Sequence, residues 1–253
     1  MSYSDLKGKT YIITGAASGQ GRTTALFLAR QGANVGLLDL RKPDDVLEEV
    51  TRIGAKGLAF AVDVSNYAPL EAAVKEVSDT FGGIHGAANM AGTIGTQGFK
   101  GKGYALETIE DKDWDWMMAV NLTGVKNSLK AELKYIKDNG SIINAASIAG
   151  QRGTPWNAPY GTAKWGVISL SKCAAQEFGH RGVRVNAIAP GIIDTPLAKA
   201  LGTAEQINDR LLSKTALKRI AQPEEVSKVI LFLLSDVSGY ITSSTINVDG
   251  GFQ

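Results

Sequence analysis

Short apolar runs alternate with longer segments of helical periodicity along the chain. Seven apolar runs predict buried β-strands, at 10–13, 32–39, 57–62, 84–88, 140–146, 182–189 and 244–249. Between them, apolar residues recur every three to four positions and predict helices at 22–31, 43–52, 70–81, 111–137, 158–179 and 223–234. This alternation predicts an α/β fold, a doubly wound parallel sheet with helices on both faces.

Two segments interrupt the alternation. Residues 93–107 form a glycine-rich stretch that is long for a connection between a strand and a helix, which favours a substrate-lining or mobile role. Residues 196–218 predict a helical insertion of mixed polarity, and we expect a substrate lid at about 192–218. No linker, repeat or low-complexity segment divides the chain, so a single domain over 1–253 is expected.

Composition narrows the possible functions. The 253 residues are 44% hydrophobic and 21% charged with a net charge of +2, and no basic block suggests nucleic acid or an anionic membrane surface as a partner. Cys173 is the only cysteine, so an internal disulfide is impossible, and with two histidines a metal site is not expected. The N-terminus lacks a signal-like apolar stretch, and no apolar run is long enough to cross a bilayer. These features predict a cytoplasmic protein.

A glycine-rich turn follows the first strand. The sequence Thr14-Gly15-Ala16-Ala17-Ser18-Gly19-Gln20-Gly21 lies between strand 10–13 and helix 22–31. Glycines let the backbone approach a pyrophosphate, and a helix N-terminus offers free amides to it. The turn therefore predicts a dinucleotide site that includes Gly15, Ser18, Gly19, Gln20 and Gly21.

Asp39 ends the second predicted strand, eighteen residues after Gly21. A carboxylate there accepts hydrogen bonds from the adenosine ribose and repels a 2′-phosphate, which favours NAD over NADP. Arg41 and Lys42 follow closely and could offset the repulsion, so NADP stays an alternative. We expect the neighbouring Leu40, and Asp63 and Val64 after the third strand, to contact the adenosine half.

Small and polar residues follow the later strands. Where several parallel strands end together, a flat cofactor can approach their backbone. The sequence therefore predicts further cofactor contacts after the fourth and sixth strands, at Asn89, Ala91, Gly92, Pro190, Gly191, Ile193 and Thr195.

Tyr160 and Lys164 are one helical turn apart, so both side chains lie on one face of the predicted helix. A nearby ammonium favours the phenolate and would help Tyr160 act as a base. Ser147 follows the fifth strand, and its hydroxyl could hold a substrate oxygen at the same point. Asn121 interrupts an apolar helix, where its amide either bonds a carbonyl or distorts the helix around a water. Tyr-x-x-x-Lys alone is common on solvated helices, so the prediction depends on the other motifs.

Together these motifs resemble the short-chain dehydrogenase/reductase family over essentially the whole chain. The matching features are Thr14-Gly15-x-x-x-Gly19-x-Gly21, Asp39, Asp63-Val64, Asn89-x-Ala91-Gly92, Asn121, Ser147, Tyr160-x-x-x-Lys164 and Arg184-Val-Asn-x-Ile-x-Pro190-Gly191. The resemblance implies a Rossmann fold and a catalytic tetrad of Asn121, Ser147, Tyr160 and Lys164, with Tyr160 and Lys164 also contacting the cofactor. It also implies a homodimer or homotetramer built on the long helices near 111–137 and 158–179. Met90 and Gln20 depart from the family pattern, and the sequence offers no account of Gln20.

The predicted activity is NAD-dependent interconversion of a secondary alcohol and a ketone, on a ring-bearing or otherwise hydrophobic small molecule. By position, the expected substrate contacts are Gln97, Phe99, Gln151, Trp156, Asn157, Ile192, Leu197 and Leu201. Two alternatives stay open at this point. One is an NADPH-dependent ketone reductase, and the other is a dinucleotide-binding scaffold without turnover.

Overall fold

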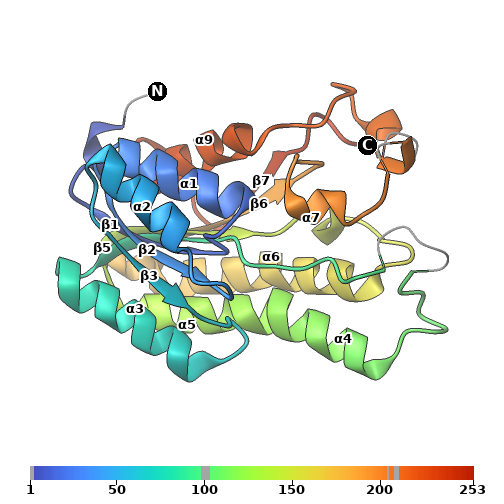
Figure 1. Ribbon diagram of the computed structural model, residues 1–253, viewed down its shortest axis with the longest axis horizontal. Coiled ribbons are helices and arrows are strands. Elements are labelled where there is room, and N and C mark those ends of the chain that lie inside the picture. The colour runs from blue at the N-terminus through green and yellow to red at the C-terminus, as the bar shows by residue number, and fades with distance from the viewer. Residues whose placement is uncertain (1–2, 98–102, 204, 208–210) are drawn as a thin grey trace.

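A seven-stranded parallel sheet forms the middle layer of the molecule (Figure 1). The computed structural model describes residues 3–97, 103–203, 205–207 and 211–253. The strands follow the spatial order β3-β2-β1-β4-β5-β6-β7. Their bounds are β1 Thr10–Thr14, β2 Asn34–Asp39, β3 Gly57–Ala61, β4 Ile84–Asn89, β5 Ile136–Ala145, β6 Arg184–Pro190 and β7 Thr245–Val248. The predicted fold class is confirmed.

Helices cover both faces of the sheet. On one face lie α1 (Gly19–Arg30), α2 (Asp44–Ile53) and α9 (Pro223–Leu234) (Figure 1). On the other lie α3 (Tyr67–Phe81), α5 (Gly124–Tyr135) and α6 (Ala158–Phe178), with α4 (Asp111–Met118) extending α5 outward. The chain passes from β1 to β2 on one side and later returns to β4 on the other side of β1. In sheets with such a reversal, ligands bind at the carboxyl ends of the strands beside it, here β1 and β4.

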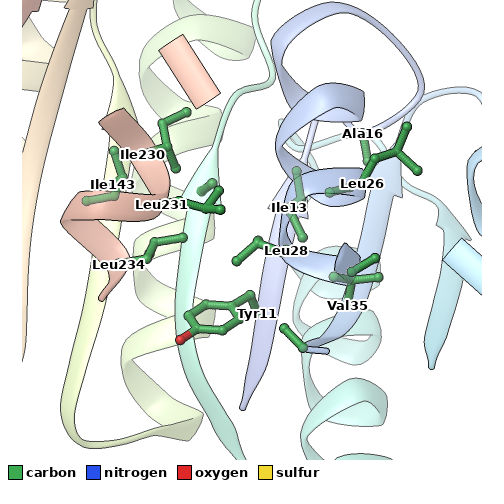
Figure 2. Close-up of a cluster of buried hydrophobic side chains, with 14 of the residues drawn as sticks. Tyr11, Ile13, Ala16, Leu26, Leu28, Val35, Ile143, Ile230, Leu231 and Leu234 are labelled. Atoms are coloured by element: carbon green, nitrogen blue, oxygen red, sulfur yellow. The ribbon is translucent and has the colours of Figure 1, made fainter. Parts of the chain in front are cut away.

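The alternation of side chains along β1 divides the core in two. Tyr11 and Ile13 belong to the apolar cluster under α1 and α9, together with Leu28 and Ile230 (Figure 2). Ile12 points the opposite way, into the cluster formed with α3, α5 and α6. All five β1 residues are buried, because a central parallel strand has a helical layer on each face.

The predicted helix 111–137 is wrong at its C-terminal end, because α5 ends at Tyr135. It also contains a π-helical turn at Ala119–Thr123, where a distortion at Asn121 is one of the two outcomes expected from the sequence. β5 then begins at Ile136, four residues before the predicted strand 140–146. Ile136 pairs with Ile84, and the register shifts before Gly86 pairs with Ser141. Long-range strand pairing therefore overrides the helical pattern of residues 136–137.

The segment predicted as a helical lid is less regular than expected. Its described residues include a short helix α7 (Pro196–Lys199) and a 3₁₀ turn at Leu212–Lys214. Thr195 caps α7, since its Oγ1 accepts a hydrogen bond from the Ala198 amide at 3.2 Å. The lid role stays a prediction.

None of the helices in the described ranges has the length and apolar character needed to span a membrane.

Candidate active site

The glycine-rich turn packs tightly between β1, β4 and α1. A Cβ on Gly15, whose φ is +68°, would lie 2.8 Å from the Ala91 backbone nitrogen. A Cβ on Gly21 would lie 2.1 Å from the Gly15 carbonyl oxygen. The first α1 bond runs from the Arg22 amide to the Ser18 carbonyl at 3.1 Å, so the amides before Arg22 precede the helical ladder. Free amides and the helix dipole make this turn a cradle for an anion such as a pyrophosphate.

Asp39 is held against this turn. Its Oδ2 accepts a hydrogen bond from the Ala17 amide at 2.9 Å, and its Oδ1 accepts one from the Arg41 amide at 3.2 Å. Arg41 and Lys42 each have a neighbouring carboxylate, Asp45 at 3.6 Å and Asp44 at 3.0 Å. A 2′-phosphate would have to compete with the carboxylates of Asp45 and Asp44 for these two cations. Leu40, beside Asp39, is exposed.

The side chains of the expected adenosine contacts after β3 are engaged with protein. Asp63 Oδ1 accepts hydrogen bonds from the amide and the hydroxyl of Ser65, and Oδ2 accepts one from Asn66. Val64 is buried, and a Cβ on Gly124 would meet it at 2.6 Å. A ligand would therefore meet mainly the backbone of 63–64 and the remaining lone pairs of Asp63.

Asn89 serves a buried network. Its Nδ2 donates to Glu132 Oε2 and to Asn144 Oδ1, both at 2.9 Å, and Asn144 in turn donates to Ser171 Oγ at 2.9 Å. These four residues join β4, α5, β5 and α6. The sequence analysis assigned Asn89 to the cofactor, whereas the structure uses both donors of its amide to tie strand ends together. Ala91, two residues on, donates its amide to Thr14 Oγ1 at 3.2 Å.

Glu132 is the least expected member of that network. It is fully buried, and burial raises the pKa of its carboxyl to about 8, although the hydrogen bond from Asn89 lowers it. Glu132 Oε1 and Asn89 Oδ1 both lack a partner among the described residues. Burial therefore favours the neutral, protonated form of Glu132. That form can donate a hydrogen bond.

This burial predicts a pH-dependent stability. Because the folded pKa of Glu132 is raised above its unfolded value, its contribution is complete below about pH 4.5 and is lost as pH rises through about 8. Over that range we expect a loss of roughly 3–5 kcal/mol in unfolding free energy from this group. Glu132→Gln, which keeps one donor and one acceptor, should remove this slope in urea titrations at pH 5 to 9. An unchanged slope would contradict the assignment.

Asn121 bonds a carbonyl of its own helix and also lies where that helix is distorted. Its Nδ2 donates to the Met117 and Thr93 carbonyls, each at 2.9 Å, and its Oδ1 accepts from the Thr93 amide at 3.0 Å. The helix widens to a π-turn there, as often happens at functional sites. A Cβ on Gly92 would lie 2.9 Å from Asn121 Oδ1 and 3.4 Å from Lys164 Nζ. Gly92, Asn121 and Lys164 therefore converge at the β4 end.

Ser147, Tyr160 and Lys164 meet beside this point. Ser147 follows β5 and caps a 3₁₀ turn, and its hydroxyl is hydrogen-bonded to Tyr160. Lys164 Nζ lies 5.5 Å from the centroid of the Tyr160 ring and donates to the Ala145 carbonyl at 2.8 Å. The predicted shared helix face is confirmed by this contact.

The protonation of the pair reflects its burial. Burial raises the pKa of Tyr160, while the hydrogen bond with Ser147 lowers it. Burial lowers the pKa of Lys164 to about 8. In the protein alone, burial of Tyr160 therefore disfavours the phenolate that the sequence predicts from a nearby ammonium. A positive charge brought in beside Tyr160 would shift the balance toward the phenolate.

The β6 end closes the site on the other side. A Cβ on Gly19 would lie 3.1 Å from Thr195 Cγ2, and a Cβ on Gly191 would lie 2.9 Å from Asp249 Cα. Thr195 and Ile193 are buried. Pro190 is the last residue of β6, so Gly191, Ile193 and Thr195 follow the carboxyl edge of the sheet toward the glycine turn.

The mouth of the site is built from two connected segments. Asn157 Nδ2 donates to the Ile94 carbonyl at 3.1 Å, and the Tyr104 amide donates to the Trp156 carbonyl at 2.8 Å. Trp156 is half exposed and has a φ of +65°. These contacts hold part of the predicted substrate loop against the residues that precede Tyr160.

The other predicted substrate contacts differ in their exposure. Gln151 is exposed and donates to Asn247 Oδ1 at 2.9 Å. Gln97 and Leu197 are exposed, and Ile192 and Leu201 are partly buried. Phe99 and lid residues 204 and 208–210 lie outside the described residues. The role of every one of these residues stays a prediction.

Sequence reasoning missed Thr14 and Glu132 as organising residues. Thr14 is the first residue of the glycine motif, and the local sequence pattern does not predict its hydrogen bond with the Ala91 amide. Glu132 did carry a signal, because Val125, Leu129 and Glu132 follow helical spacing and place a carboxylate on an apolar face.

Comparison with known proteins identifies the family. A family model described as enoyl-(acyl carrier protein) reductase matches residues 15–253. A protein named short-chain dehydrogenase/reductase aba4, from Botryotinia fuckeliana, is 38% identical over 262 residues that cover 100% of both chains. The chain belongs to the short-chain dehydrogenase/reductase family. It is an oxidoreductase that acts on CH–OH or keto groups with NAD or NADP.

Two further relatives are informative. The cyclohexanol dehydrogenase of Acinetobacter sp. strain SE19 is 37% identical over 248 residues, 96% of this chain and 94% of that one. The structure of carveol dehydrogenase from Mycobacterium avium in complex with NAD matches with a TM-score of 0.90 and 27% identity, and 98% of each chain is covered. The short-chain dehydrogenase/reductase fold is thus shared over the full length.

Proposed function

We propose that this short-chain dehydrogenase/reductase interconverts a secondary alcohol and a ketone with NAD. The observation that carries the proposal is the meeting of Ser147, Tyr160 and Lys164 beside a glycine turn that holds Asp39. The residues fit a dinucleotide. The turn offers free amides to a pyrophosphate, Asp39 offers a carboxylate to a ribose, and Gly92 keeps the space beside Asn121 and Lys164 free of a side chain.

The residue roles follow from this geometry. The chemistry that bound NAD supplies is hydride exchange with the substrate carbon. Tyr160 takes the proton of the substrate hydroxyl, or returns one to the carbonyl oxygen, and Ser147 hydrogen-bonds that oxygen. Lys164 lies beside the Tyr160 ring, and its ammonium together with the positive charge of an oxidised nicotinamide would favour the phenolate. Asn121 fixes the Thr93 backbone at the same point.

The substrate proposed is a hydrophobic, ring-bearing alcohol. The relatives named cyclohexanol dehydrogenase and carveol dehydrogenase support an alcohol as substrate, and the first supports a ring. Trp156 at the mouth is half exposed and could pack on such a ring. Residues at about 192–218 would form the lid. The cytoplasm is the proposed location, from the sequence features alone.

NADPH-dependent ketone reduction is the second candidate. One observation favours it: the Arg41 guanidinium lies on the turn side, with Nη2 3.5 Å from the Ala17 carbonyl, near where a 2′-phosphate would sit. The carboxylates of Asp39 and Asp45 would repel a 2′-phosphate there. The description of the family model names a reductase but no dinucleotide.

The test follows absorbance at 340 nm with NAD and NADP in parallel, over a panel of cyclic and open-chain secondary alcohols and their ketones. We expect turnover on cyclic alcohols with NAD, and at least about tenfold higher kcat/KM than with NADP. Asp39→Ser should shrink that preference by removing the carboxylate. Equal rates with NADP would overturn the NAD assignment. Tight binding of either dinucleotide without turnover on any panel member would favour a scaffold.

A second copy of this chain is the proposed partner. An apolar groove between α5 and α6 is lined by Leu129, Leu133, Leu170 and Phe178, with Lys126, Lys130 and Glu177 at its rim. These helices lie in the segments that the sequence predicts as a dimer or tetramer interface. Light scattering should give the mass of two or four chains, and Leu133→Asp should lower it. A mass of one chain for the wild type would contradict the proposal.

A further inference from the structure

Gln20 has an unmet hydrogen-bonding group in the glycine-rich turn. It is the second residue of α1, and its side-chain oxygen Oε1 is covered from solvent. No described residue donates a hydrogen bond to Oε1. Leaving a buried acceptor unpaired costs about 1–3 kcal/mol, so a residue that does so in a binding site is expected to gain its partner from the ligand.

The surroundings of Gln20 decide which part of a dinucleotide can supply that partner. The preceding residue, Gly19, lies against Thr195 at the end of β6, on the side of β1 where β5 leads to Ser147. Asp39, the proposed ribose ligand, follows β2 on the opposite side of β1. Gln20 directly follows Gly19, so it begins α1 next to the segment after β6, on the side of β1 away from Asp39.

The missing partner must be a donor. The free amides of the turn are themselves donors, and a pyrophosphate offers only acceptors. On the nicotinamide half of a dinucleotide the donors are the ribose hydroxyls and the amine of the carboxamide, and only the amine is absent from ADP-ribose. Buried oxygens of Tyr11, Asn89, Glu132 and Asn157 also lack a hydrogen-bond partner among the described residues, but none of these residues lies in the glycine-rich turn.

We propose that Gln20 Oε1 accepts a hydrogen bond from the nicotinamide carboxamide amine. This inference rests on the proposed dinucleotide function. It makes Gln20 a positioning residue: the bond fixes the rotation of the carboxamide and, through it, which face of the ring is turned toward Tyr160. The departure from the family pattern at position 20 is thereby explained by a polar contact in place of an apolar one.

The test measures binding without turnover, by fluorescence titration or calorimetry. Three ligands are compared: NADH, the reduced 3-acetylpyridine analogue, in which a methyl group replaces the amine, and ADP-ribose, which has no nicotinamide. In Gln20→Leu, which is similar in size but cannot accept a bond, we expect NADH affinity to fall about tenfold. Affinity for the analogue and for ADP-ribose should stay within about twofold of the wild-type values. The variant should therefore distinguish NADH from the analogue less well than the wild type does.

Gln20→Glu is the matched variant. It keeps an acceptor at the same place, so the preference for NADH over the analogue should remain, while its charge weakens all three ligands alike through the pyrophosphate. Gln176→Leu, an exposed glutamine in α6, controls for the substitution itself. Equal loss of all three ligands in Gln20→Leu, or no loss of any, would overturn the assignment. Failure of the wild-type protein to bind any of them would sink the dinucleotide function as well.

Discussion

Tyr160→Phe is expected to lower kcat at least about a thousandfold while leaving NADH affinity within about threefold. The substitution removes the only group that the proposed mechanism uses to move a proton to or from the substrate oxygen. General acid–base catalysis by one side chain contributes about 10²–10⁴ in rate, and the hydrogen bond between Tyr160 and Ser147 is lost as well.

The readouts that test this are steady-state rates in both directions and fluorescence titration with NADH. Tyr240→Phe is the matched control, because Tyr240 is fully exposed and far from the site in the sequence. A normal thermal midpoint for both variants would show that folding is intact. Residual activity of Tyr160→Phe above a tenth of wild type would remove Tyr160 from its catalytic role.

Gly21→Ala is expected to lower dinucleotide affinity at least about a hundredfold and to destabilise the fold by about 1–3 kcal/mol. The added methyl group would lie 2.1 Å from the Gly15 carbonyl oxygen and 2.7 Å from its carbon. Both atoms belong to the backbone, so neither can rotate away. The start of α1 would have to move from the turn, and the free amides would lose their common direction.

Gly179→Ala separates this effect from the general consequence of adding a methyl group. Gly179 has a φ of −58° and a ψ of −30°, and nothing lies within 4 Å of its Cβ position. Gly179→Ala should leave the free energy of unfolding unchanged or raise it slightly, because alanine restricts the conformations of the unfolded chain. Both variants are compared by urea unfolding and by NADH titration. Wild-type NADH affinity in Gly21→Ala would contradict the packing argument.

The interruption at Asn121 and the network around Asn89 show where sequence reasoning ends. An asparagine in an apolar helix signalled a distortion, and the π-turn at Ala119–Thr123 bears this out. The partners of that asparagine, in the Thr93 backbone, lie 28 residues away and had no local signal. Asn89 was assigned to a cofactor because it ends a strand. In the structure its amide donates to Glu132 in α5, and the sequence does not show that this helix packs against the end of β4.

The sequence by itself determined the alternation of strands and helices, the glycine turn between β1 and α1, and the shared face of Tyr160 and Lys164. Each depends on spacing within a few residues, which backbone geometry converts directly into structure. Tertiary structure alone decided the strand order, the end of α5 at Tyr135, the burial of Glu132 and the unpaired oxygen of Gln20. These depend on which distant segments meet, since a hydrogen bond or a desolvation cost exists only when both surfaces are brought together.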